Sequence, residues 1–248
     1  MKRYLVMVVA LVSGTIGGMA NARDTQTVLI TGANRGIGLE YARQFSARGY
    51  TVIGTARDLA DAKELSAVAR RVEQLDVTDA ASVAALARRL DGVAIDILVN
   101  NAGVFDRRDS TVDKVDFTVM ENTFAVNTLG PLRVVQALLP NLRRGKRKTI
   151  VNMSSQLGSI GNSSGGWYAY RASKAALNQV NKSLAVELGP NGFICVVLHP
   201  GWVRTDMGGS GATYSPEESV SGLIAVIEKL QPADNGRFYD FKGNAIPW

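Results

Sequence analysis

The stretch TVLITGANRGIG, residues 27–38, decides the fold of this chain. A short, β-branched apolar run ends in a glycine-rich turn, and the turn leads directly into a helical pattern. Gly32, Gly36 and Gly38 let the backbone bend tightly and approach a ligand closely. The helix N-terminus beyond them offers unpaired N–H groups and a favourable dipole to a pyrophosphate. The spacing G-x-x-x-G-x-G differs from the dinucleotide fingerprint G-x-G-x-x-G, so a purely structural turn stays open.

Strand-like and helical patterns alternate through the rest of the chain. Apolar runs of strand type lie at residues 27–31, 50–56, 72–77, 95–100, 148–154, 193–199 and 237–241. Helical patterns lie between them at about 38–48, 59–70, 80–90, 115–142, 168–188 and 216–230. This alternation predicts parallel strands joined by crossover helices. We therefore expect one Rossmann-like, doubly wound α/β domain over residues 23–248, with about seven strands and helices on both faces.

The first 22 residues, MKRYLVMVVALVSGTIGGMANA, have the layout of a secretory signal peptide. A basic start and an apolar stretch precede the small-residue ending Ala20-Asn21-Ala22, so cleavage is expected after Ala22. An uncleaved anchor and a start codon that the cell does not use, with Met19 as an internal candidate, are the alternatives. This leader is left out of the fold prediction, because the first strand begins after it.

Composition excludes several classes of function. The formal charge is +6, and the one dense basic run, RRGKRK at residues 143–148, contains no aromatic residues. A solvated loop is therefore predicted there, and no nucleic-acid site. The single cysteine, Cys195, is expected to be buried, and no Cys/His cluster indicates a metal. The only histidine, His199, precedes a proline at a strand end and is interpreted as structural, which excludes a Ser-His-Asp hydrolase.

The end of the second strand, GTARD, bears on the choice of dinucleotide. A carboxylate there would hydrogen-bond the ribose of NAD, whereas an arginine suits the 2′-phosphate of NADP. Asp58 has about the right spacing, but it is equally well explained as a helix N-cap. Arg57 lies nearer the strand terminus, and Arg35 in the glycine turn is within reach of the same phosphate. The pattern favours NADP(H) over NAD(H).

Four ordered motifs resemble those of the short-chain dehydrogenases/reductases, classical type. They are TGANRGIG, LVNNAG at residues 98–103, Tyr170-Arg-Ala-Ser-Lys174, and HPGWVRTDM at residues 199–207. The stretches at residues 158–178 and 201–209, with the terminal IPW, resemble the sniffer/C-factor branch in particular. This branch is associated with carbonyl reduction and, in C-factor, with signalling.

The resemblance implies that Tyr170 donates a proton to a substrate carbonyl while the nicotinamide supplies the hydride. A phenol does this well if its pKa is drawn down, and a nearby ammonium favours the phenolate. Residues four apart share a helix face, so Lys174 is the partner of Tyr170, whereas Ala172 occupies that position for Tyr168. Tyr168 is therefore predicted to pack beside the pocket.

Ser155 and Asn127 complete the catalytic set that the resemblance implies. Ser154 and Ser155 follow the fifth strand and point to opposite sides, and the family pattern selects Ser155 to hold the developing alkoxide. Asn127 matches the asparagine that helps to hold a water near Lys174. A local cap or kink in a helix that contains Pro131 is its alternative explanation.

Further positions match the cofactor contacts of the family. The resemblance implies that Lys174 also bonds the nicotinamide ribose, that Asp76 meets the adenine, and that Thr205 binds the carboxamide end. A turn stabilised by Asn and Gly is the alternative explanation for residues 101–103. The complete expected cofactor set is Gly32, Asn34, Arg35, Gly36, Ile37, Gly38, Arg57, Asp76, Val77, Asn101, Ala102, Gly103, Tyr170, Lys174, Pro200, Gly201, Val203 and Thr205.

The segment after Gly201, rich in Gly, Ser and Thr, is predicted to be a mobile substrate loop. An apolar pocket lining from Phe105, Leu157, Trp167, Trp202 and Met207 would suit a hydrophobic aldehyde, ketone or quinone. Such a small-molecule carbonyl or alcohol is the expected partner, with no membrane insertion of the mature domain.

Two functions and two locations remain open from the sequence. An NADPH-dependent carbonyl reductase is favoured, because a protein that only binds a dinucleotide for signalling has no need of the acid. The two long helices around Asn127 and Lys174 resemble the dimer-forming pair of the family, which predicts a homodimer or homotetramer. The need for a nicotinamide pool indicates the cytoplasm, whereas the leader indicates export.

Overall fold

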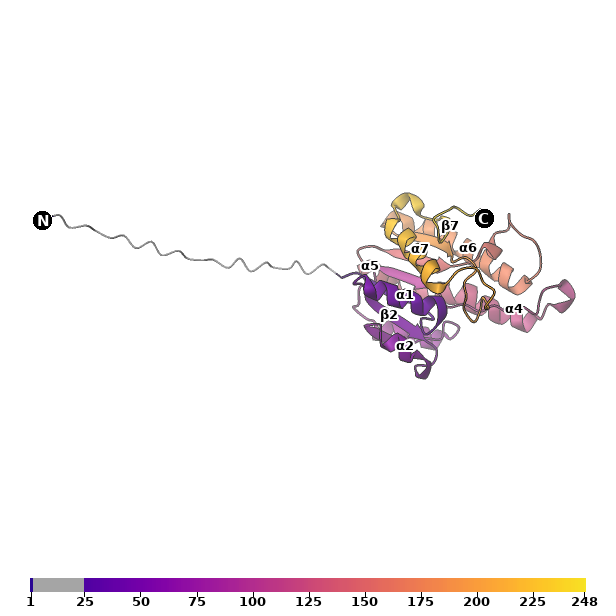
Figure 1. Ribbon diagram of the computed structural model, residues 1–248, viewed down its shortest axis with the longest axis horizontal. Coiled ribbons are helices and arrows are strands. Elements are labelled where there is room, and N and C mark those ends of the chain that lie inside the picture. The colour runs from indigo at the N-terminus through magenta and orange to yellow at the C-terminus, as the bar shows by residue number, and fades with distance from the viewer. Residues whose placement is uncertain (2–24) are drawn as a thin grey trace.

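A computed structural model describes Met1 and residues 25–248 (Figure 1). The predicted leader, 1–22, and its cleavage point lie outside the described residues apart from Met1. Seven parallel strands form one sheet in the order β3-β2-β1-β4-β5-β6-β7. Their bounds are β1 Thr27–Ile30, β2 Thr51–Ala56, β3 Arg71–Gln74, β4 Ile97–Asn100, β5 Thr149–Met153, β6 Ile194–His199 and β7 Phe238–Asp240. The doubly wound fold predicted from the sequence is confirmed.

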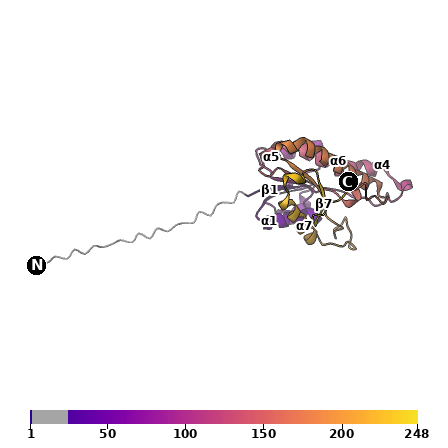
Figure 2. The same cartoon turned by 90° about the horizontal axis from the view of Figure 1, so that it is seen from above.

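Helices cover both faces of the sheet, and each face has its own apolar core. The bounds are α1 Gly36–Ala47, α2 Lys63–Ser66, α3 Ala80–Arg89, α4 Phe117–Phe124, α5 Gly130–Arg144, α6 Tyr168–Leu188 and α7 Pro216–Lys229. Figure 2 shows α1 and α7 on one side of the sheet and α5 and α6 on the other. None of the helices in the described part of the chain is both long enough and apolar enough to span a membrane.

Two predicted helices differ from the observed elements. The stretch predicted at residues 59–70 forms only a 3₁₀ turn, Ala60–Ala62, and the four-residue α2. The single helix predicted at residues 115–142 is divided into α4 and α5 by a π-helical stretch, Ala125–Leu129. Pro131 stands at the start of α5, where its missing N–H is tolerated, and it explains why the α-helical ladder is interrupted just before it.

The strand order places the site. The chain fills the sheet from β1 outward to β3, then returns to the other side of β1 with β4. The carboxyl ends of β1 and β4 therefore lie side by side at the point where the winding reverses. Ligands of doubly wound proteins bind at this crevice, so the glycine turn after β1 and the Asn-Ala-Gly turn after β4 face the same region.

Candidate active site

The glycine turn after β1 forms a bend in which side chains have no room. Gly32 and Gly36 have φ values of +61° and +54°, which an L-residue adopts only with strain. A Cβ on Gly38 would lie 2.3 Å from the carbonyl oxygen of Gly32. The amide of Ala33 donates to the carbonyl of Thr55 at 2.7 Å, which ties the turn to the end of β2.

Asn101 and Ala102, after β4, hold the turn from the other side. The side-chain amide of Asn101 donates to the carbonyls of Thr31 and Gly32 at 3.0 Å each. The backbone amides of Asn101 and Ala102 both reach the hydroxyl of Thr31, at 3.0 and 3.1 Å. Turn stabilisation, one of the two explanations of residues 101–103, therefore accounts for the Asn101 side chain.

The first turn of α1 has no side chain that caps its amides. Arg35 occupies the N-cap position and makes no side-chain cap, and the first turn contains no acidic residue. Helices α3, α4 and α7 are instead capped by Asp79, Asp116 and Ser215. An uncapped N-terminus with glycines in front of it fits an anionic group such as a pyrophosphate. Asn34 and Ile37 belong to this turn, where Ile37 packs against the core of α1 and α7.

The end of β2 presents an arginine and a carboxylate that is already engaged. Asp58 accepts a hydrogen bond from the amide of Ala60 at 2.9 Å, which closes a turn, but the N-cap position of the 3₁₀ turn that follows is held by Leu59 and not by Asp58. Arg57 is exposed, and its charge helps to hold the pKa of Asp76 below its ordinary value, after the larger effect of hydrogen bonds from Thr78. Arg57 thus lies near Asp76, beyond the carboxyl ends of β2 and β3. Val77 is buried and packs beside Gly130.

Tyr170, Lys174 and Ser155 meet at the carboxyl end of β5. Tyr170 is 8% exposed, and a hydrogen bond with the Ser155 hydroxyl acts on its phenol. The ammonium of Lys174 lies 5.6 Å from the centre of the Tyr170 ring and donates to the carbonyl of Met153 at 2.8 Å. The neighbouring Ser154 is buried with a hydroxyl that has no hydrogen-bond partner.

The expected lowering of the Tyr170 pKa is not found. Burial raises the pKa of Tyr170 to about 12, and the hydrogen bond with Ser155 opposes this only in part. Burial lowers the pKa of Lys174 to about 8. In this structure the pKa of Tyr170 is therefore set by burial and not by the charge of Lys174. The spacing of four residues correctly indicated proximity, but it contained no information on how deeply the pair is buried.

Asn127 lies in the π-helical stretch and is fully buried. Its side-chain oxygen accepts from the amide of Val104 at 2.9 Å, and its side-chain nitrogen donates to the carbonyl of Val104 at 2.9 Å and to the hydroxyl of Ser173 at 3.1 Å. A Cβ on Gly103 would lie 3.3 Å from the Asn127 oxygen and 3.6 Å from the Lys174 nitrogen. Asn127 thus fixes the turn after β4 against α6, beside Lys174.

The loop after β6 closes over the glycine turn. A Cβ on Gly36 would lie 3.4 Å from the Thr205 methyl group, and Arg35 and Asp206 form an exposed ion pair at 3.5 Å. The loop begins at Pro200 and Gly201, whose φ is +81°, and Val203 is buried behind it. Hydrogen bonds between residues 202–204 and Tyr214 close the loop on itself before α7 begins.

The residues expected to line the pocket near Tyr170 differ in their contacts and in their exposure. Phe105 lies 4.3 Å from Tyr170 and 5.7 Å from Trp167, measured between ring centres. Tyr168 is 41% exposed at the start of α6, so it is not a core residue, and its place beside the pocket stays a prediction. The remaining expected lining residues are half-buried Leu157 and two exposed side chains of the loop after β6, Trp202 and Met207.

Two residues of this region were missed in the sequence. Asp109 is 3% exposed, and its carboxylate accepts from the amide of Ala169 at 2.5 Å, in the first turn of α6. Arg107 donates to the carbonyls of Met207 and Gly208 at 2.7 and 3.2 Å. Both contacts join parts of the chain that lie 60 or more residues apart, and no local pattern marks them.

His199 and Cys195 take no part in this arrangement. Burial lowers the pKa of His199 to about 4, so its imidazole is neutral near neutral pH. Burial raises the pKa of the Cys195 thiol to about 12. Among the residues that the structure describes, no group of His, Cys, Asp or Glu side chains has the arrangement of a metal site.

The glycine turn, the uncapped α1 and the Tyr170–Lys174 pair lie at the carboxyl edge of one sheet, and comparison with known proteins gives the family. The model of the short chain dehydrogenase family matches residues 26–213. The chain belongs to this family.

Relatives and solved structures agree with this assignment. C-signal of Myxococcus xanthus is 48% identical over 155 residues, which cover 62% of this chain and 93% of that protein. The carbonyl reductase Sniffer of D. melanogaster is 35% identical with a TM-score of 0.85, covering 90% of this chain and all of that one. An NADPH-bound carbonyl reductase from chicken fatty liver is 35% identical with a TM-score of 0.84, covering 90% and 99%. The resemblance to the sniffer/C-factor branch is confirmed.

Proposed function

We propose that this protein is an NADPH-dependent reductase of small, hydrophobic aldehydes, ketones or quinones. The observation that supports it most strongly is the position of Tyr170. The phenol is buried, hydrogen-bonded with Ser155 and adjacent to Lys174, at the carboxyl edge of the sheet where the glycine turn lies. A general acid must be protonated before it acts, and a pKa of about 12 keeps Tyr170 protonated near neutral pH.

NADP(H) is the proposed cofactor. Gly32, Gly36 and Gly38 leave space against the backbone, and the uncapped N-terminus of α1 would receive the pyrophosphate. Arg57 and Arg35 are exposed and could meet a 2′-phosphate, for which Arg35 would exchange its exposed ion pair with Asp206, whereas the Asp58 carboxylate is engaged by Ala60. The chicken carbonyl reductase, which has the same fold, is NADPH-bound.

The chain's own residues would act on the substrate oxygen, while the reduced nicotinamide supplies the hydride. Ser155 and Tyr170 would both hydrogen-bond the carbonyl oxygen and stabilise the developing alkoxide. Tyr170 would then donate its proton to that oxygen. Lys174 would place a positive charge behind the phenol and favour the phenolate left after transfer. Asn127 would keep the turn after β4 and the helix of Lys174 in register.

Signalling without turnover is the second candidate, because the similarity to C-signal covers 62% of the chain. The two are separated by following NADPH oxidation with a panel of aldehydes, ketones and quinones, and by identifying the alcohol product. The proposal predicts turnover with at least one apolar carbonyl compound and a preference for NADPH over NADH. Tight NADPH binding without oxidation in any member of the panel would favour the signalling role.

A homodimer or homotetramer remains our proposal for the assembly. Leu132 on α5 and Val186 on α6 are apolar and are 38% and 70% exposed. Burial of such side chains between copies would remove apolar area from water. Light scattering on wild type and Val186→Lys would test this, since a charge at the interface should reduce the mass toward that of one chain.

A further inference from the structure

Segment 104–110, which follows β4, contacts both the first turn of α6 and the loop after β6. Phe105 packs on Tyr170, Arg107 reaches the loop after β6 and Asp109 binds the first turn of α6. The contact of Arg107 spans 100 residues of sequence and crosses between the turn after β4 and the loop after β6. Arg107 is exposed, and both its guanidinium and the Tyr170 ring contact the ring of Phe105.

The guanidinium of Arg107 is fixed in place but keeps its charge. Its carbon lies 5.4 Å from the centre of the Phe105 ring, and a single nitrogen, Nη2, donates to the carbonyls of Met207 and Gly208. Carbonyl oxygens orient a guanidinium without neutralising it. In the described part of the chain no acidic side chain forms an ion pair with Arg107, and its Nε and Nη1 make no hydrogen bond.

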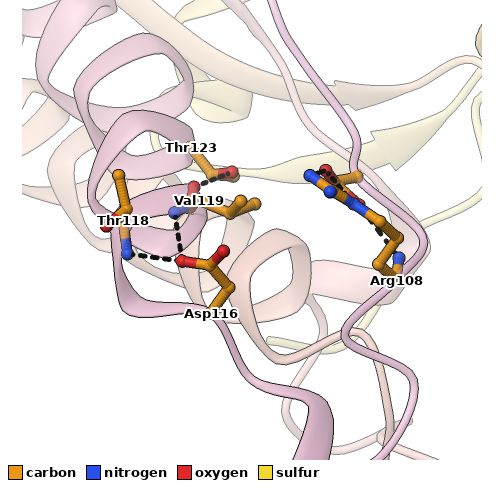
Figure 3. Close-up of polar contacts among 6 residues, drawn as sticks. Arg108, Asp116, Thr118, Val119 and Thr123 are labelled. Atoms are coloured by element: carbon orange, nitrogen blue, oxygen red, sulfur yellow. Dashed lines mark hydrogen bonds and ion pairs between the residues drawn. The ribbon is translucent and has the colours of Figure 1, made fainter.

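Two acidic side chains nearby, Asp106 and Asp116, are already engaged by other partners. Arg108 binds both carboxylate oxygens of Asp106, at 3.0 and 2.5 Å, and holds the pKa of that carboxyl below its ordinary value. Asp116 accepts from the amides of Thr118 and Val119 and caps α4. Figure 3 shows Arg108 on one side of this region and the Asp116 cap of α4 on the other. Neither carboxylate is left to balance Arg107.

A cavity of about 580 Å³ lies between segment 104–108 and α4. Phe105, Arg107 and Arg108 line it on one side, and Thr118 and Asn122 on the other. Phe105 is thus shared between this cavity and the catalytic phenol. A compound whose carbonyl meets Tyr170 would have to pass Phe105 to reach this cavity, which the Arg107 guanidinium and the Asp106 carboxylate, paired with Arg108, also line.

We propose that Arg107 is a specificity-determining residue that binds an acidic group of the substrate, so that the preferred substrates are apolar or aromatic carbonyl compounds with a carboxylate. Arginine is suited to this because its guanidinium keeps its charge and can donate a charge-assisted hydrogen bond to a carboxylate from a nitrogen that the loop carbonyls leave free. The Phe105 ring provides an apolar surface for the body of the substrate. This inference rests on the proposed carbonyl reductase function and names its substrate class.

The test compares 4-carboxybenzaldehyde with its methyl ester in wild type and Arg107→Gln. The intrinsic reactivity of each aldehyde is the same for every enzyme form, so the change in the ratio of kcat/KM values isolates the protein's contribution. A charge-assisted hydrogen bond lost at this site should lower the ratio of acid to ester by about tenfold or more. The ratio, and not the turnover of the ester alone, is the readout, because Arg107 also holds the loop after β6.

Arg204→Gln is the matched control, because Arg204 also donates to two carbonyls of the loop after β6, those of Ala212 and Thr213. It should leave the ratio unchanged. If Arg107→Gln lowers turnover of acid and ester equally, Arg107 only holds the loop and the proposal fails. An unchanged ratio in Arg107→Gln overturns it as well.

Binding of 4-carboxybenzaldehyde, followed by tryptophan fluorescence without turnover, separates this inference from the proposed function. Weaker binding of the acid to Arg107→Gln than to wild type is expected even in a protein that fails to oxidise NADPH. Absence of turnover would count against the reductase function alone. Equal binding of the acid to wild type and Arg107→Gln would overturn the role of Arg107.

Discussion

The Phe105 ring lies 4.3 Å from the Tyr170 ring between centres, with the ring planes tilted by 31°. Phe105 comes from the turn after β4 and Tyr170 from the first turn of α6, 65 positions later. This contact helps to bury the proposed proton donor, and burial is the cause of its raised pKa of about 12. Access to the phenol and its acidity are therefore linked to the conformation of one segment.

Phe105→Ala should lower the pKa of Tyr170 from about 12 toward the ordinary value, because water would reach the phenol. The variant should also lose about 1–2 kcal/mol of folding stability, since a half-buried ring is removed. A spectrophotometric titration of phenolate absorbance, with Tyr170→Phe subtracted to isolate this residue, measures the shift. Phe105→Leu should keep most of the burial and most of the shift. An unchanged pKa in Phe105→Ala would show that other groups bury Tyr170.

Carbonyl reduction should decline as the pH rises through about 8, because Lys174 loses its proton there. The sign follows from burial, which lowers the pKa of Lys174 to about 8, so the ammonium is complete well below that pH and absent well above it. Tyr170, at about 12, stays protonated throughout this range. The pH profile of kcat/KM should move to higher pH in Lys174→Arg, because a guanidinium keeps its charge. If kcat/KM of Lys174→Arg declines at the same pH as that of the wild type, a group other than Lys174 causes the decline.

Arg57→Ala should raise the KM for NADPH by about tenfold or more and leave the KM for NADH nearly unchanged. The reason is that only NADPH has the 2′-phosphate that the arginine is proposed to meet. Steady-state kinetics with both cofactors measures the difference. Arg88→Ala, at an exposed arginine of α3, is the control for loss of one positive charge. Equal effects on NADPH and NADH would place Arg57 outside the phosphate site.

Asp109→Ala should destabilise the protein by about 1 kcal/mol or more, because it removes the carboxylate that binds the first turn of α6. This helix has no other side-chain cap at its N-terminus. Unlike Asp79→Ala, which removes the cap of α3, it should also reduce kcat, since the amide of Ala169 directly precedes Tyr170. Denaturant unfolding and kinetics of both variants test this. An equal fall of kcat in Asp109→Ala and Asp79→Ala would show that lost stability, and not the position of Tyr170, causes the fall.

The fold was predictable because the strand-helix alternation and the glycine turn are local patterns. Helix α6 was predicted with its observed bounds, Tyr168–Leu188, since no proline interrupts it. The prediction of a single helix over residues 115–142 is wrong just before Pro131. There the π-helical stretch Ala125–Leu129 replaces the regular α-helical hydrogen bonds. The short region 59–70 reads as helical in sequence, yet it forms little more than two turns, since helices this short depend on tertiary packing.

The candidate site was predictable only where a motif spans it. Tyr170 and Lys174 are four residues apart on one helix, so their proximity followed from the sequence. The depth of burial, and with it the raised pKa of Tyr170, depends on residues that lie far apart in the sequence, with Phe105 of a distant turn among its contacts. Asp109 and Arg107 act through backbone groups of other segments, and such contacts leave no pattern in either stretch of sequence.

The most direct measurement of the central claim is the NADPH oxidation rate of Tyr170→Phe and of Tyr168→Phe with a carbonyl substrate of the wild type. Both variants lose one hydroxyl within the first turn of α6, but only Tyr170 lies beside Ser155 and Lys174. We predict that kcat falls by a factor of about 10²–10⁴ in Tyr170→Phe, the usual contribution of a positioned acid, and changes little in Tyr168→Phe. Oxidation of NADPH by Tyr170→Phe at the wild-type rate would contradict the account.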